Sequence, residues 1–315
     1  MNTAPSSPLH FISTTASDRA LVLGGGGSTG NAWLIGVIAG LSDAGLDVTT
    51  ADLTIGTSAG STAAAQIAGA TPGELLAAIL AAAPQPQPRR QQGTGPAGSG
   101  GGRVPSKPVA DHMERTSKII AAAEDAADMR RRMGAAALDM DAASDGSVQQ
   151  RWRATVAARL PSQHWPQRRV LITAVDAQSG EPVIFDRHSG VDLTDAVAAS
   201  CASGFAYRIG DNSYIDGGYR SNAENADLAA GFQRVLVLSP FGGRTRTPLD
   251  WGLHLATQVD GLRAGGSRVE TIFPDSNSEH MFGANAMDLT LRPPAARAGY
   301  NQGSVLAERL TEFWG

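Results

Sequence analysis

The segment from Thr54 to Thr62, TIGTSAGST, constrains the fold of this chain more than any other stretch. It contains the pattern G-x-S-x-G around Ser58, which predicts a nucleophile elbow, a sharp turn from a strand into a helix. Gly56 and Gly60 lie two residues before and after the serine, where such a turn leaves little room for side chains. In a chain with 37 glycines the pattern arises easily by chance, so its interpretation depends on other segments.

A short apolar run and a run of glycines precede the elbow. Residues 20–23, ALVL, predict a buried parallel strand, and Gly24 to Gly30 follow it directly. Residues 32–44 read as a largely apolar helix, 53–55 as a second strand and 61–70 as a helix after the elbow. This succession of strand, glycine loop, helix, strand, elbow and helix predicts a parallel sheet with right-handed crossovers.

The rest of the chain predicts one large α/β domain rather than two domains in tandem. Further strands are expected at residues 169–175, 182–185, 213–216, 234–238 and 268–273. Further helices are expected at 72–83, 111–143, 148–160, 193–202, 248–262 and 303–314, with a short helix capped by Asn225 and ending at Ala230. The domain is expected to span 19–315, after a disordered tail at 1–18, with a flexible basic loop at 84–108 and a helical cap at 109–160 inserted.

The glycine loop has two chemical interpretations. Gly25, Gly27 and Gly30 fit G-x-G-x-x-G, the dinucleotide fingerprint, but that motif needs an acidic residue after the second strand, where Thr57-Ser58 stand here. A P-loop is excluded because no Gly-Lys-Ser/Thr follows. The better fit is an oxyanion hole lined by Gly25, Gly26 and Gly27, with the last two as N–H donors. A nucleotide- or phosphate-binding loop remains the alternative.

A serine hydroxyl needs a base to remove its proton. Asp216 follows a short apolar strand and precedes Gly217 and Gly218, which let the chain turn and leave the carboxylate facing open space. Such a carboxylate can act as general base without a histidine. A hydrolase triad with a late histidine, His254 or His280, is the alternative.

The order of glycine loop, G-x-S-x-G and Asp-Gly-Gly resembles the patatin-like phospholipase family, from about Ala20 to the C-terminus. Further likeness lies in residues 197–202, VAASCA, and 225–229, NADLA. The resemblance implies a three-layer α/β/α fold with a mainly parallel central sheet, and an acyl hydrolase acting on lipids or simpler esters. It implies Ser58 as nucleophile and Asp216 as base, with no cofactor and no metal.

Two departures from the family pattern bear on the substrate. Thr29 stands where the family usually has Arg or Lys, which weakens the expectation of a phospholipid more than that of a hydrolase. Residues 202–208, ASGFAYR, lack the prolines that the family often has there, so the wall of the acyl pocket is expected to differ. A catalytically silent member of the fold, acting as an interaction module, remains a further alternative.

Composition limits the other classes of function. The net charge of -4 argues against a general nucleic-acid binder, and a single cysteine, Cys201, excludes an internal disulfide framework. Neither a signal peptide nor a membrane span is visible, so a cytoplasmic protein is expected. The loop at 84–108 carries basic and no acidic residues, which suits a solvated loop, a lid or contact with an anionic membrane. Oligomeric state and natural substrate are left open.

Overall fold

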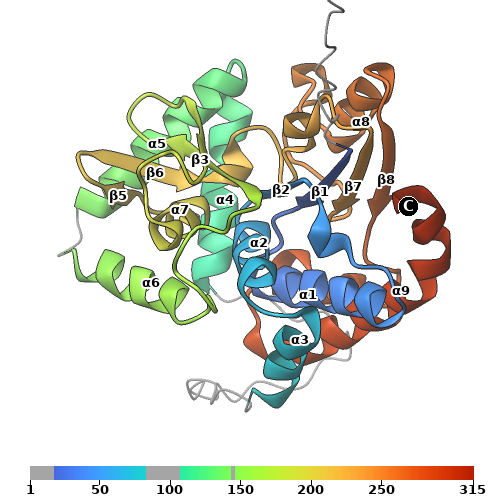
Figure 1. Ribbon diagram of the computed structural model, residues 1–315. Coiled ribbons are helices and arrows are strands. Elements are labelled where there is room, and N and C mark those ends of the chain that lie inside the picture. Colours follow the sequence, from blue (N-terminus) through green and yellow to red (C-terminus); the bar gives the residue numbers. More distant parts are fainter. Residues whose placement is uncertain (1–17, 83–106, 143–145) are drawn as a thin grey trace, which may run out of the picture.

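The computed structural model describes residues 18–82, 107–142 and 146–315 (Figure 1). Within these ranges eight strands form one sheet in the order β5-β6-β3-β2-β1-β7-β8, with β4 paired to β3. The strands are β1 (Arg19–Leu23), β2 (Leu53–Gly56), β3 (Arg169–Asp176), β4 (Pro182–Phe185), β5 (Tyr207–Ile209), β6 (Asn212–Asp216), β7 (Arg234–Leu238) and β8 (Arg268–Ile272). The predicted strands are therefore confirmed, and β5 is an addition.

The helices cover both faces of the sheet (Figure 1). They are α1 (Gly27–Asp43), α2 (Ala59–Gly69), α3 (Pro72–Ala81), α4 (Lys107–Ala122), α5 (Ala126–Ala142), α6 (Ser147–Ala157), α7 (Leu193–Ser200), α8 (Leu255–Ala264) and α9 (Arg292–Trp314). Short 3-10 turns lie at Val48–Thr50, Gly217–Tyr219, Ala226–Ala229, Leu249–Trp251, Glu279–Met281, Gly283–Asn285 and Leu289–Leu291.

The sheet is mainly parallel, as predicted. β1 pairs in parallel with β2 and β7, β2 with β3, and β7 with β8. The antiparallel pairs β3–β4, β3–β6 and β5–β6 lie at the end of the sheet that carries Asp216. Because the parallel strands point the same way, the chain leaves β1, β2 and β7 at one edge of the sheet.

Alternate side chains of β1 pack against the helices on opposite faces of the sheet. Leu21 and Leu23 pack in the cluster that contains α1, α7 and α9, whereas Ala20 and Val22 pack in the cluster that contains α8. All four side chains are fully buried. A strand buried on both faces explains the continuous apolar run in the sequence and gives the three-layer α/β/α architecture that was expected.

Helices α4, α5 and α6 follow α3 and precede β3 in the chain. Met129 and Met133 of α5 pack against Val175 of β3 and Ile215 of β6, so this segment covers the antiparallel end of the sheet. The expectation of one helix over 111–143 was wrong, because the chain breaks between α4 and α5. There Asp125 Oδ1 accepts a hydrogen bond from the Asp128 N–H, which caps a new helix.

Other element boundaries also differ from expectation. The helix expected at 248–262 is a 3-10 turn followed by α8, because Gly252 adopts a left-handed φ of 67° that interrupts it. The helix expected at 303–314 begins instead at Arg292. Pro293 and Pro294 stand in its first turn, where backbone N–H groups have no helical partner.

The predicted tail at 1–18 and the predicted basic loop at 84–108 fall almost wholly outside the described residues. Those two predictions stay untested. Among the described helices none is both long and apolar enough to cross a membrane on its own. Helices α2 and α3 reach that length only together, and they are bent by 119° at the break between them.

Helices α1 and α9 approach each other so closely that only glycine fits at the contact. A Cβ on Gly36 of α1 would lie 2.1 Å from the Ala296 carbonyl oxygen, and one on Gly40 would lie 2.1 Å from that of Tyr300. From the other side, a Cβ on Gly299 would lie 2.4 Å from the Trp33 carbonyl oxygen. This contact stabilises α9 despite its prolines and glycines, which by themselves disfavour a helix.

We predict that Gly36→Ala lowers the free energy of unfolding by about 1–3 kcal/mol, because the helices must separate to admit the methyl group. Gly261→Ala is the matched control. Gly261 lies inside α8 with no atom within 4 Å of the added Cβ, so that change should be neutral or stabilising by up to about 1 kcal/mol. Urea unfolding measures both, and equal effects of the two substitutions would contradict this account of the contact.

Candidate active site

Ser58 lies in the sharp turn between β2 and α2. Its φ of 52° and ψ of −117° place a non-glycine residue in a region that costs free energy. The two motif glycines allow this turn to pack. A Cβ on Gly60 would lie 1.8 Å from the Leu23 carbonyl oxygen, and one on Gly56 would lie 2.6 Å from the Ser61 Cα. The side chain of Ser58 is half-buried and so keeps access to solvent.

The hydroxyl of Ser58 points at the carboxylate of Asp216. Ser58 Oγ donates a hydrogen bond to Asp216 Oδ2 over 2.8 Å. Asp216 ends β6, and its other oxygen, Oδ1, accepts a hydrogen bond from the Gly218 N–H over 2.8 Å. Gly217 packs against β3 so closely that a Cβ on it would lie 2.1 Å from Thr173 Oγ1. The fold thus brings together two residues that are 158 positions apart in the sequence.

No histidine in the described part of the chain bonds to Ser58. The alternative partners considered from the sequence pair elsewhere: His254 Nε2 with the Thr247 carbonyl oxygen at 3.0 Å, and His280 Nδ1 with the Asn277 carbonyl oxygen at 2.9 Å. The geometry therefore favours a serine–carboxylate pair over a triad with a late histidine.

Burial dominates the electrostatics of Asp216. Its side chain is 7% exposed, and this desolvation raises the pKa of the carboxyl to about 6. Hydrogen bonds from the Gly218 N–H and the Ser58 hydroxyl act in the opposite direction and stabilise the charged form. A carboxylate with a pKa just below neutrality is ionised at pH 7 and still basic enough to take a proton in a transition state.

Two residues at the end of α7 hold the backbone of the elbow, and nothing in the sequence patterns indicated their roles. The Ser58 N–H donates to Ser200 Oγ over 2.9 Å, and Cys201 Sγ donates to the Ser58 carbonyl oxygen over 3.0 Å. Burial, followed by the charge of Asp216, raises the pKa of the Cys201 thiol to about 11, so it remains a protonated donor.

The glycine loop begins α1 beside the elbow. A Cβ on Gly25 would lie 3.5 Å from Ser58 Cβ, which places the loop next to the serine. The Gly25 N–H donates to the Ala223 carbonyl oxygen over 2.7 Å and is therefore already engaged. Among the described residues, the N–H groups of Gly26 and Gly27 have no acceptor, although both glycines are tightly packed. Backbone N–H groups in the first turn of a helix have no helical acceptor, and the helix dipole there favours negative charge.

Gly30 closes the first turn of α1, where its N–H donates to the Gly26 carbonyl oxygen over 3.0 Å. A Cβ on Gly30 would lie 3.1 Å from Pro240 Cβ, and one on Gly26 would lie 2.5 Å from the same atom. The loop after β7 therefore packs directly on the glycine loop. Thr29 is the residue that replaces the basic side chain of the family pattern. It is fully buried, and its N–H donates to the Ala286 carbonyl oxygen over 3.0 Å.

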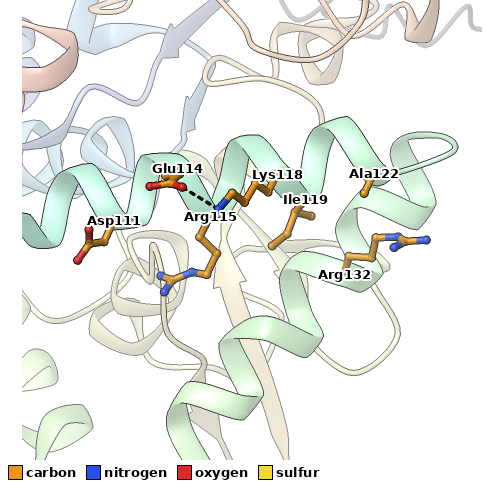
Figure 2. A pocket seen from close by; sticks show the side chains of 7 residues that line it. All are labelled: Asp111, Glu114, Arg115, Lys118, Ile119, Ala122 and Arg132. Carbon is orange, nitrogen blue, oxygen red and sulfur yellow. Dashed lines mark ion pairs between the residues drawn. The ribbon is translucent and has the colours of Figure 1, made fainter.

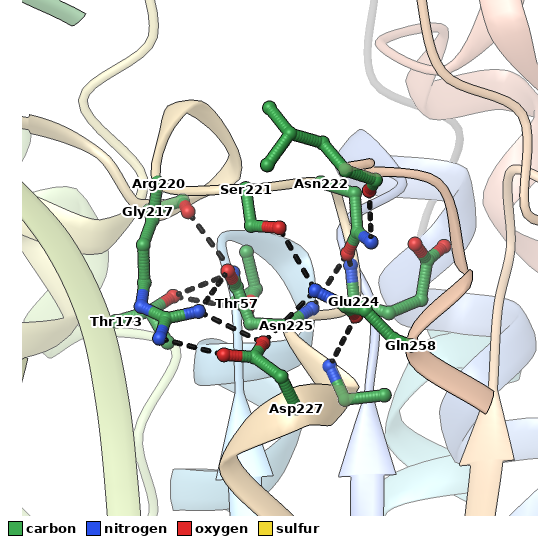
Figure 3. Close-up of polar contacts among 12 residues, drawn as sticks. Thr57, Thr173, Gly217, Arg220, Ser221, Asn222, Glu224, Asn225, Asp227 and Gln258 are labelled. Atoms are coloured by element: carbon green, nitrogen blue, oxygen red, sulfur yellow. Dashed lines mark hydrogen bonds and ion pairs between the residues drawn. The ribbon is translucent and has the colours of Figure 1, made fainter. Parts of the chain in front are cut away.

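The segment after Asp-Gly-Gly contains polar side chains that sequence reasoning did not assign to the site (Figure 3). Glu224 is 1% exposed, its Oε1 accepts from Ser239 Oγ over 2.6 Å, and burial raises its pKa to about 7. Asn225 was expected to cap a short helix. Asn225 does stand at the N-cap position of the turn Ala226–Ala229, but its side chain makes no capping bond there.

A surface depression of about 550 Å³ lies between α4 and α5 (Figure 2). Its lining includes Arg115, Arg132 and the ion pair of Lys118 Nζ with Glu114 Oε1 at 2.7 Å. Neither Ser58 nor Asp216 lines this depression, so it is separate from the serine–carboxylate pair. The ion pair on its wall is exposed and therefore contributes little to stability. Within the ranges described, no three His, Cys, Asp or Glu side chains gather as a metal site would require.

Comparison with known proteins gives a family and two distant structures. The model of the patatin-like phospholipase family matches residues 21–227. VipD from Legionella pneumophila is 13% identical, with 93% of this chain and 67% of that chain covered and a TM-score of 0.40. The type III effector protein ExoU is 14% identical, with 93% and 53% covered and a TM-score of 0.36, so this chain spans about half of ExoU. No curated protein matches this chain significantly.

We predict that Asp216→Asn raises the free energy of unfolding at pH 8 by up to about 3 kcal/mol. The folded-state pKa lies above the unfolded value, so the folded protein loses stability as the pH rises through the interval between them. Asparagine removes this cost at pH 8 and should change little at pH 4. Urea unfolding at the two pH values measures the effect, with exposed Asp250→Asn as the matched control. An equal change in stability at both pH values would contradict a raised pKa of Asp216 in the folded protein.

Proposed function

The chain belongs to the patatin-like phospholipase family, and from this premise we propose that it is a serine hydrolase that cleaves carboxylic ester bonds of lipids. One observation carries the proposal: the hydroxyl of Ser58, in a strained turn at the end of a parallel strand, donates a hydrogen bond to the buried carboxylate of Asp216 over 2.8 Å. A nucleophile within hydrogen-bond reach of its base is what covalent catalysis of acyl transfer requires.

In the first half of the reaction, Asp216 Oδ2 takes the proton of Ser58 as Oγ forms a bond to the ester carbonyl carbon. The carbonyl oxygen becomes an oxyanion. We assign its stabilisation to the N–H groups of Gly26 and Gly27, helped by the dipole of α1. One such donor typically contributes about 3 kcal/mol to the transition state.

The intermediate then collapses with cleavage of the bond to the alcohol, which leaves with the proton held by Asp216. This leaves an acyl-enzyme at Ser58. In the second half, Asp216 takes a proton from water as the water oxygen attacks the acyl carbon, and Ser58 regains its proton when the carboxylic acid departs. Each turnover consumes one ester and one water and returns both side chains to their starting state.

Membership of the family supports a lipid as the substrate, and we assign no headgroup. Thr29 is buried and uncharged at the position where the family usually has a basic residue, so the glycine loop itself offers an anionic headgroup no side-chain cation there. Hydrolysis of simpler esters is part of the same proposal. The competing functions are a phosphate or nucleotide site at the N-terminus of α1, and a catalytically silent interaction module.

We predict that Ser58→Ala lowers kcat for p-nitrophenyl esters by about 10⁴-fold or more, and Asp216→Asn by about 10²–10⁴-fold. Ser304→Ala and Asp250→Asn, which lie outside the site, are the matched controls and should keep wild-type rates. If Ser58→Ala is inactive but Asp216→Asn is not, another base must be sought. Saturable nucleotide binding by a wild type that hydrolyses no ester would favour the competing functions.

The pH profile offers a separate test of the base. Because Asp216 must be ionised and its pKa is raised to about 6, kcat/KM should fall about tenfold per pH unit below that value. Glu224→Gln removes the other buried carboxyl of raised pKa and should leave this acid limb in place. An acid limb near pH 4 in the wild type, or one that disappears in Glu224→Gln, would contradict the role of Asp216.

A further inference from the structure

Asn225 combines burial with an unusual backbone. It is fully buried, and its φ of 56° lies in the left-handed region. In the described part of the chain only one other non-glycine residue has a positive φ, and that residue is Ser58. Strained residues persist where the surrounding structure holds them in place, and they gather at functional sites.

The side chain of Asn225 joins the two halves of the site. Its Nδ2 donates to Thr57 Oγ1 over 3.0 Å and to the Gly217 carbonyl oxygen over 3.0 Å (Figure 3). Thr57 is the residue before Ser58, and Gly217 is the residue after Asp216. A third, longer contact of 3.5 Å reaches Thr173 Oγ1, which itself donates to Thr57 Oγ1 over 2.9 Å. One amide group thus connects the backbone turns that carry Ser58 and Asp216.

The turn around Asn225 also contacts the glycine loop. The carbonyl oxygen of Ala223 accepts the hydrogen bond from the Gly25 N–H. Asn222 holds the turn from within, because its Oδ1 accepts from the N–H groups of Glu224 and Asn225 over 2.9 and 2.7 Å. All three motifs of the site are therefore bonded to residues 222–225.

We propose that Asn225 is a positioning residue that fixes the separation of Ser58 Oγ and Asp216 Oδ2 by bonding to the residues next to each. The inference rests on the proposed hydrolase function. An amide suits this task because both hydrogens of Nδ2 find acceptors, and asparagine tolerates the left-handed backbone better than most residues. Loss of the bridge removes one hydrogen bond from each of two acceptors inside the protein, Thr57 Oγ1 and the Gly217 carbonyl oxygen, and frees the two turns to move apart.

The first test substitution is Asn225→Gly, which accepts the positive φ and removes the amide. We expect kcat for p-nitrophenyl butyrate to fall about 100-fold with KM within about threefold, because misplacing the reacting groups affects the transition state more than binding. The rate of Ser58 labelling by a fluorophosphonate, in which Oγ bonds to phosphorus and fluoride leaves, should fall in parallel.

Gln258→Leu is the matched structural control. Gln258 Oε1 accepts from the Ala226 N–H over 2.9 Å, and its Nε2 donates to Ser221 Oγ and Asp227 Oδ1, so it holds the same segment from outside the site. Its replacement should lower the melting temperature while kcat stays within about threefold of wild type. A role of Asn225 in stability alone would make the two variants lose activity in proportion to their loss of stability.

A second pair of variants covers the case in which Asn225→Gly does not fold. Thr57→Val removes the hydroxyl that accepts from Asn225 with little change of shape, and Thr57→Ser keeps that hydroxyl. We expect Thr57→Val to lower kcat and Thr57→Ser to restore most of it. Equal kcat in the two Thr57 variants would overturn the proposal, as would wild-type kcat in Asn225→Gly.

The pH profile separates positioning from stability. The hydrogen bond from Ser58 lowers the pKa of Asp216. If Asn225→Gly weakens this bond, the pKa of Asp216 rises and the acid limb of kcat/KM moves to higher pH. Gln258→Leu should leave the acid limb where it is. The other titratable groups facing Asp216 are Cys201 and Tyr219, whose pKa values are raised to about 11 and about 12, so neither titrates there. If the wild type hydrolyses no ester, the hydrolase proposal fails, and the labelling rates still decide the role of Asn225.

Discussion

The site depends on one close approach of backbone, between the end of β1 and the start of α2. The Thr57 N–H donates to the Leu23 carbonyl oxygen over 3.1 Å, and Gly60 packs on that same oxygen with no space for a Cβ. This contact brings the glycine loop after β1 and the elbow after β2 together at one edge of the parallel sheet. Pairing of β1 with β7 adds Pro240, which packs on the glycine loop from the other side. The strand order therefore assembles the site before any side chain contributes.

Reactive groups at this edge are held in states that cost free energy. Ser58 adopts a strained backbone, Asp216 is a carboxyl buried deeply enough to raise its pKa, and Asn225 is a non-glycine residue with positive φ. The well-packed contacts elsewhere, such as the glycine-mediated contact of α1 with α9, offset such costs. Strain at Ser58 and desolvation at Asp216 follow from placing a serine and its base at the surface of a tightly packed sheet.

Local sequence signals predicted the parallel strands and the elbow, whereas the pairing of Ser58 with Asp216 was implied by the resemblance to the patatin-like phospholipase family. The strands and the elbow can be recognised in a sequence. The elbow requires glycine at Gly56 and Gly60, and a strand buried on both faces requires a continuous apolar run. Contacts between distant segments leave no such pattern, which is why the bonds of Ser200 and Cys201 to the elbow were not foreseen. Asn225 was assigned to a local cap because two of its partners, Thr57 and Thr173, lie far away in the sequence. The helix predicted at 303–314 was too short for a similar reason. The first part of α9 has low helix propensity of its own, and its packing on α1 stabilises it.

The central claim is that Ser58 becomes covalently acylated during ester hydrolysis. The most direct measurement is mass spectrometry of the enzyme after rapid acid quench with a p-nitrophenyl ester, followed by peptide mapping. The account predicts one added acyl group per chain, on the peptide that contains Ser58, and none in Ser58→Ala. An active enzyme with no adduct at Ser58, or with the acyl group on another side chain such as Cys201, would contradict it.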